Sequence, residues 1–108
     1  MPQNSGVRGS ETARTHDRFL RELNEERAAA LMRISRTLES DIAGLQRSRE
    51  RIGGMSGAER AREVAAYDAL RQHALRYRWY LEVQREAIGM RHHHMLDEFY
   101  RIPGPIER

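Results

Sequence analysis

Apolar residues recur at steps of three and four along two long stretches of the chain, which is the spacing of a helix that buries one face. The first stretch contains no proline and reaches residue 52. Some of its apolar positions repeat every eleven residues, a period that favours straight or slightly right-handed packing. We therefore predict one helix over residues 10–52, whose apolar positions are Leu20, Leu23, Leu31, Ile34, Leu38, Ile42, Leu45 and Ile52.

A break in the pattern follows at the glycines Gly53 and Gly54. Consecutive glycines end a helix readily, because glycine adopts the backbone conformations that close it. Ser56 and Glu59 then have the spacing of a capping box, the arrangement that starts a new helix. The sequence predicts a tight turn over residues 53–56.

The second stretch begins at residue 57 and stops before Pro103, since a residue that precedes proline is pushed out of the helical conformation. We predict a helix over residues 57–101, followed by a short tail over residues 103–108. At 100° per residue, one set of apolar side chains shares a face of this helix: Leu70, Ala74, Tyr77, Leu81, Ile88, Met95 and Phe99.

The first nine residues do not show the helical spacing of apolar positions. Residues 1–9 are polar, contain one proline and two glycines, and show no periodicity, which is typical of a disordered leader. Ser10 or Thr15 is suited to cap the first helix, and the sequence does not decide between them.

A second apolar stripe lies on the nearly opposite side of the second helix. Two helices bury the core that they share, but they leave this second stripe exposed. The predicted fold class is therefore all-α: a long antiparallel helical hairpin that pairs with a second copy into a four-helix bundle, because two-fold homodimers are the commonest homo-oligomers. The alternative is a partner protein that supplies the missing helices. The predicted interface residues are Trp79, Val83, Ala87 and Met90.

Composition excludes several classes of site. The chain has 108 residues, is 32% charged, and contains neither cysteine nor lysine, so disulfides, thiolate nucleophiles and Schiff-base chemistry are excluded. No strained Gly-x-Ser-x-Gly turn or Gly-rich phosphate loop is present. We expect no enzymatic activity and no cofactor. Without a long apolar run or a signal-peptide core, a cytoplasmic protein is the expectation.

The histidines are candidate metal ligands. His92, His93 and His94 are consecutive, so on a helix their rings would point about 100° apart and would not share one ion. The best metal option combines His94, Glu98 and His16, which the hairpin would bring together. The Glu-x-x-His spacing of di-iron bundles is absent, and we predict no metal site.

Arginines account for all 19 positive side chains, and the net charge is +3. A stripe of Arg71, Arg78 and Arg85 on the second helix is interpreted as a solvated, salt-bridged face in preference to a phosphate track. A denser cluster at the hairpin tip is a candidate anion-binding surface. Its members are Arg47, Arg49, Arg51, Arg60 and Arg62.

One segment resembles a family of short bacterial helical proteins of unknown function. The residues that carry the resemblance run from Val83 through Gly89 to Arg91, and the likeness covers mainly the second helix. It implies a small helical bacterial protein and transfers no activity. It differs at Ile88, where the family has cysteine. The resemblance marks one group of residues as a unit: Gln84, Arg85, Glu86, Gly89 and Arg91.

These observations together favour a non-enzymatic structural or regulatory module that self-associates and binds another macromolecule, which we expect to be a protein. The alternative is a nucleic-acid-associated factor that uses the arginines of the hairpin tip. A metal-dependent enzyme is a distant third interpretation.

Overall fold

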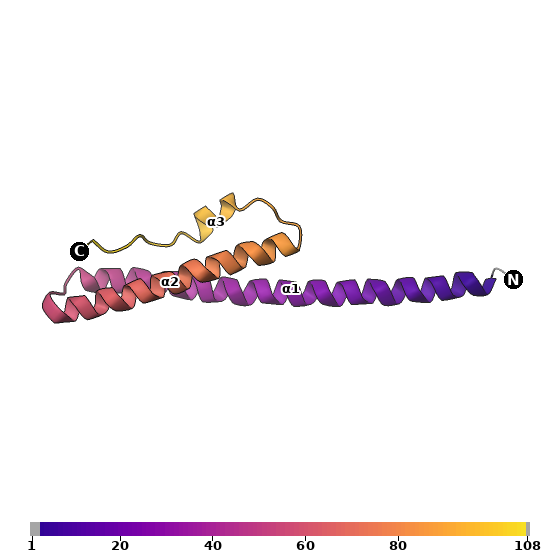
Figure 1. The fold of residues 1–108 in the computed structure, drawn as a ribbon, viewed down its shortest axis with the longest axis horizontal. Helices are drawn as coiled ribbons and strands as arrows, with labels where there is room; N and C mark the ends of the chain where they lie inside the picture. Colours follow the sequence, from indigo (N-terminus) through magenta and orange to yellow (C-terminus); the bar gives the residue numbers. More distant parts are fainter. Residues whose placement is uncertain (1–2, 108) are drawn as a thin grey trace.

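The computed structural model describes residues 3–107, with side chains from Ser10 onward. The described residues form three helices and no strand: α1 (Gln3–Ile52), α2 (Gly57–Ala87) and α3 (His94–Phe99). α1 and α2 pack antiparallel along one half of α1 (Figure 1). The all-α class and the helical hairpin are confirmed.

The turn between α1 and α2 lies where the glycines predict it. Gly53 and Gly54 follow the last residue of α1, and the amide of Gly54 donates to the carbonyl of Arg51. Ser56 occupies the N-cap position of α2 in an extended conformation, but its side chain makes no capping hydrogen bond. Gly57 has a φ of 61°, in the left-handed region. The capping-box prediction is therefore right about the position and wrong about the side-chain bond.

α1 is much longer than α2. It begins at Gln3, so residues 3–9, predicted as part of a disordered leader, lie within the helix, and residues 1–2 fall outside the described range. Extending an existing helix requires no new nucleus, which is why two glycines do not stop it. Neither predicted cap residue begins α1, and the Thr15 hydroxyl donates to the carbonyl of Glu11 one turn earlier.

The hairpin core repeats every seven residues. The buried side chains of α1 include Leu38, Leu45 and Ile52, and those of α2 include Tyr67 and Ala74. Seven-residue spacing keeps one seam facing a neighbouring helix. The eleven-residue period read from the sequence does not describe the buried seam, because it mixed seam positions with residues on its flanks.

α2 ends at Ala87 instead of continuing to residue 101. Gly89 has a φ of 90°, its amide donates to the carbonyl of Glu86, and the Met90 amide donates to the carbonyl of Arg85. This pair of bonds is a Schellman motif, with glycine at its left-handed position. The prediction of an uninterrupted second helix is wrong: α2 closes at this motif, with Gly89 in the left-handed conformation.

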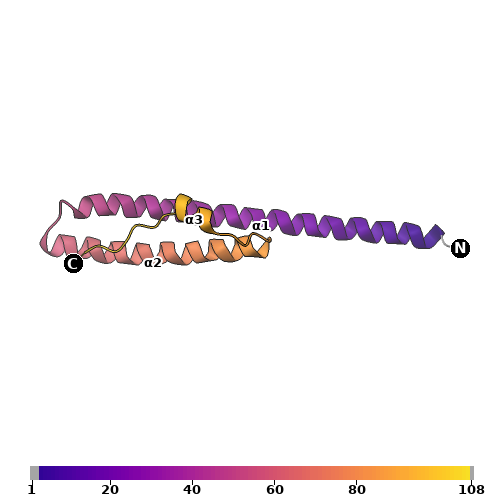
Figure 2. The same ribbon diagram turned by 90° about the horizontal axis from the view of Figure 1, so that it is seen from above.

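The remaining residues fold back over the hairpin as a third layer. After the reversal, α3 and the extended residues 100–107 run toward the hairpin tip, alongside both long helices (Figure 2). Leu96 of α3 is buried, and three residues of the extended part pack on the core: Tyr100, Ile102 and Ile106. The predicted tail therefore covers the hairpin from one side.

The molecule is a rod measuring 85 × 22 × 14 Å. At its far end, about half of α1 projects beyond the last residue of α2 (Figure 1). Arg27 Nη1 donates to the carbonyl of Ala87 at 3.2 Å and so places the end of α2 along α1. A cation at the C-terminus of a helix is favourably placed relative to the helix dipole.

Candidate interaction surfaces

The predicted interface stripe lies exposed on α2. Trp79 is 60% exposed, and Val83 and Ala87 are also exposed. Leu75, one turn before Trp79, is an exposed apolar residue that extends the stripe at the same four-residue step. Met90 is exposed but lies beyond the end of α2, so helical periodicity no longer aligns it with the others.

Aromatic rings connect this stripe with the hairpin interior. Ring centroids lie 5.6 Å apart for Trp79 and Tyr80, 5.3 Å for Tyr80 and Tyr77, and 4.5 Å for Tyr77 and His73. His73 Nδ1 in turn lies 2.6 Å from a carboxylate oxygen of Asp41, which is buried on α1. A continuous series of ring and polar contacts therefore connects the exposed tryptophan with the interior of the hairpin.

The arginines of the tip are divided between structural contacts and solvent. Arg49 donates to the hydroxyl of Tyr67 and to the carbonyl of Gly104, and Arg60 donates to the carbonyl of Glu107. Arg51 pairs with Glu63. Only Arg47 and Arg62 of the predicted five have no such contact among the described side chains, and both are exposed. This division reduces the support for an anion-binding tip.

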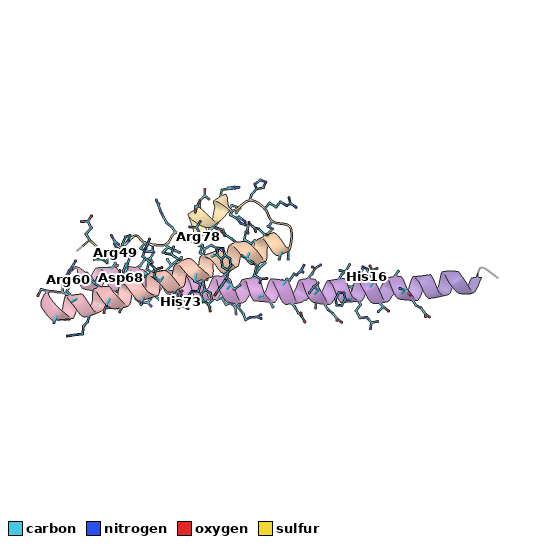
Figure 3. The ribbon with its side chains drawn as sticks, viewed as in Figure 1. His16, Arg49, Arg60, Asp68, His73 and Arg78 are labelled. Carbon is cyan, nitrogen blue, oxygen red and sulfur yellow. The ribbon has the colours of Figure 1, made fainter. Side chains whose placement is uncertain are left out.

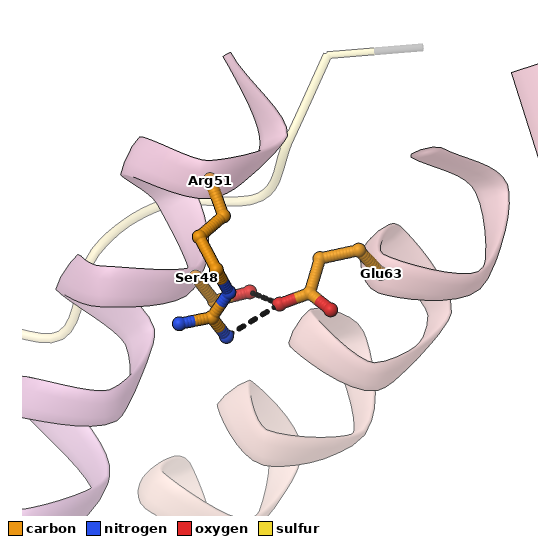
Figure 4. A network of polar contacts seen from close by, with 3 residues as sticks. All are labelled: Ser48, Arg51 and Glu63. Atoms are coloured by element: carbon orange, nitrogen blue, oxygen red, sulfur yellow. Dashed lines mark hydrogen bonds and ion pairs between the residues drawn. The ribbon is translucent and has the colours of Figure 1, made fainter. Parts of the chain in front are cut away.

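Glu63 ties the two long helices together near the tip. Its Oε1 accepts hydrogen bonds from Ser48 Oγ at 2.8 Å and from Arg51 Nη2 at 2.6 Å (Figure 4). The hydroxyl of Ser48 and then the guanidinium of Arg51 lower the pKa of Glu63 below its ordinary value, outweighing desolvation. This contact fastens the end of α1 to the start of α2.

The arginine stripe of α2 has a role that the sequence did not reveal. Arg71 Nε donates to the carbonyl of Pro103 at 2.9 Å, Arg78 pairs with Asp97, and Arg85 Nη2 donates to the carbonyl of His92 at 3.0 Å. Figure 3 shows Arg78 beneath the folded-back segment. The interpretation of this stripe as a solvated face is wrong. The seven-residue spacing of these arginines was the sequence signal for this role, because evenly spaced side chains on one face can also contact a segment that runs along the helix.

The family-like residues gather where the chain reverses. Arg85 reaches the loop, the carboxylate of Glu86 lies 2.9 Å from His93 Nε2, and Gly89 adopts the left-handed conformation. Gln84 is half-buried on α2, and Arg91 is exposed in the loop. Three of the five residues therefore act together to end α2. A Cβ atom at Gly89 would meet nothing within 4 Å, so this position needs glycine for its backbone conformation and not for a close contact.

The metal option is not assembled in this conformation. His16 lies on the projecting half of α1, whereas His94 and Glu98 belong to α3 above the hairpin (Figure 3). Among the described residues, no three histidine, aspartate or glutamate side chains are grouped as metal ligands. His92 and His93 also lie in the loop and not on a helix, so the argument from helical divergence does not apply to them.

Comparisons with protein-family models, curated proteins and solved structures gave no match to this chain. The resemblance on the second helix accordingly stays a prediction. Within the described residues, no helix has both the length and the apolar character needed to cross a membrane.

Proposed function

We propose that this chain is a non-enzymatic helical module that self-associates and binds another macromolecule. The observation that supports the proposal best is the exposed stripe of α2, centred on Trp79 and Val83. Contiguous apolar patches on the surface of a soluble domain often mark sites of protein interaction. Tryptophan is also enriched among residues whose truncation weakens binding most.

A second copy of the chain fits this stripe in a two-fold arrangement. If two copies of α2 cross antiparallel at the level of Leu81, with their exposed stripes in contact, Trp79 faces the partner's Val83 and Leu75 faces the partner's Ala87. Bulky side chains then meet small ones, which is the condition for close packing. Because the contact is self-complementary, one patch serves both partners and the assembly closes at two copies.

Self-association is testable by light scattering on the purified chain. Wild type is expected to be a dimer at micromolar concentration, and Trp79→Glu is expected to be a monomer, because dimerisation would bury an unpaired charge. Phe19→Glu is the matched control: Phe19 is equally exposed but lies on α1 outside the stripe, so this variant should stay dimeric. A fully helical wild-type monomer at micromolar concentration would refute the proposed dimer.

Binding to another macromolecule needs a separate measurement. Wild type and Trp79→Glu, immobilised side by side, would be exposed to lysate of the native host, and captured proteins and nucleic acids would be identified. A partner retained by both variants binds elsewhere on the rod, and one lost with Trp79→Glu uses the α2 stripe or the dimer. Absence of any reproducible partner on either variant contradicts this half of the proposal.

A further inference from the structure

The projecting half of α1 has an apolar face with no neighbour. Phe19 is 60% exposed and Leu20 is also exposed, whereas Ile34 and Leu38, further along the same helix, pack against the rest of the hairpin. At 100° per residue, Phe19 and Leu23 continue the side of α1 that faces α2. α2 ends too early to cover them, because its last residue lies beside Arg27.

The residues that would cover this face exist in the same chain. Met95 and Phe99 are 48% and 68% exposed on α3. In a continuous helix they share a face with Tyr77 and Leu81, the residues of α2 that pack toward α1. The exposed apolar residues of α3 thus have the helical spacing of a segment built to extend α2.

The register of the hairpin brings these two faces together. Asp41 pairs with His73 and Arg27 with Ala87, so each step back along α1 matches one step forward along α2. Continued beyond Ala87, the same register sets Met95 beside Phe19. We propose that residues 88–101 have two alternative positions: folded back on the hairpin, as observed, or continuing α2 along the projecting half of α1.

The balance between the two positions depends on Gly89. Folding back uses its φ of 90°, which alanine adopts only with strain, whereas the extended helix requires ordinary helical angles. The folded-back form buries Leu96 and engages the arginine stripe. It also leaves three buried nitrogen atoms without a hydrogen-bond partner in the described part of the chain: Arg78 Nε, Arg85 Nε and His93 Nδ1. The extended form frees these groups and covers Phe19.

A pair of spin labels reports which position is occupied, and the absence of cysteine makes labelling specific. Cysteines are placed at the exposed positions Arg14 and Arg101. In the folded-back form Arg101 lies next to Tyr100, whose hydroxyl is 3.5 Å from Glu39, so the labels are separated by roughly 35 Å along α1. In the extended form they sit on adjacent helices, whose axes are about 10 Å apart.

Gly89→Ala is expected to shift the ratio of extended to folded-back molecules by on the order of 50-fold, because alanine disfavours positive φ and favours the helix. Gly89→Asn is the control, since asparagine tolerates the left-handed conformation, and it should keep the long separation. Phe19→Gln, combined with Gly89→Ala, should reduce the short-distance population, although Phe19 is exposed in the folded-back form.

Three results would overturn the proposal. One is a Gly89→Ala variant that keeps only the long separation. Another is loss of the long separation without a defined short one, which indicates fraying of the segment. The last is a short separation that disappears when labelled chains are diluted with unlabelled ones, which assigns the projecting face to a second copy. Circular dichroism confirms in each case that the hairpin remains folded. Persistence of the short separation on dilution supports the proposal.

Discussion

Tyr67 is the residue at which all three layers of the molecule meet. Its ring is fully buried between the long helices, and its hydroxyl donates to the carbonyl of Gly104 at 2.5 Å. Arg49 Nη1 donates to both of these oxygen atoms, at 3.3 and 3.1 Å. A buried hydroxyl requires a partner, and the folded-back segment supplies it. One residue therefore links the packing of the hairpin with the position of the C-terminal segment.

Tyr67→Phe is expected to lower the free energy of unfolding by about 1 kcal/mol, the net contribution of a typical hydrogen bond. The ring stays in place and Arg49 still reaches Gly104, so the loss should be confined to the hydroxyl. Urea unfolding followed by circular dichroism measures it. Tyr80→Phe, which changes a ring that is 36% exposed, should be near neutral. Equal effects of the two substitutions would show that the Tyr67 hydroxyl contributes nothing specific.

The lowered pKa of Glu63 predicts that the stability of the folded chain depends on pH. Its pKa is lower in the folded chain than in the unfolded one, so the unfolded state binds more protons in the acidic range. The stabilisation from Glu63 is complete above the ordinary glutamate pKa of about 4.3 and is lost as pH falls through the lower folded value. The stability difference between wild type and Glu63→Gln should therefore shrink on acidification.

Unfolding at pH 7 and pH 3 measures this difference directly. Glu59→Gln serves as a control, because Glu59 is an exposed glutamate in the first turn of α2. If wild type exceeds Glu63→Gln in stability by the same margin at both pH values, the contact with Ser48 and Arg51 does not perturb this carboxylate.

At the scale of elements, the folded-back segment and a continuous α2 make opposite demands on two neighbouring residues. In the structure Leu96 is 3% exposed and Met95 is 48% exposed. In a continuous helix, Met95 would face α1 and Leu96 would point toward the side of the arginine stripe. Whichever of the two side chains contributes more to stability therefore shows which position the segment occupies.

Leu96→Ala is expected to lower the free energy of unfolding by roughly 2–5 kcal/mol, the range for removing a buried leucine side chain. Met95→Ala should have little effect on the folded-back form. Thermal and urea unfolding of both variants provides the comparison. The reverse order of effects would mean that the extended arrangement predominates in solution.

At the scale of the whole molecule, the unequal helices produce an elongated shape. The radius of gyration is 22.4 Å, whereas a compact chain of this length would have a value of about 13 Å. Small-angle scattering of the Trp79→Glu variant, expected to be monomeric, should give a value near 22 Å. A value near that of a compact chain would show that the projecting half of α1 folds back onto the hairpin.

Local sequence signals were sufficient for the hairpin itself. Two glycines in succession interrupt the helical periodicity, so the turn at residues 53–56 was predictable, and the apolar spacing indicated which faces of α1 and α2 meet. The exposed position of Trp79 and Val83 also follows from periodicity, since they lie opposite the packed face. These features depend on residues that are close together in the sequence.

The end of α2 was decided by contacts between distant residues. Periodicity alone favoured a helix to residue 101, because Met95 and Phe99 remain in phase with Leu81. Gly89 is compatible with both a helix interior and a helix end. The contacts of Arg71, Tyr67 and Arg49 with residues 103–104 favour the reversal, and their sequence separation hides them from any local pattern. The sequence alone therefore determined the helices and their turn, and the tertiary structure decided where the second helix ends and what covers the hairpin.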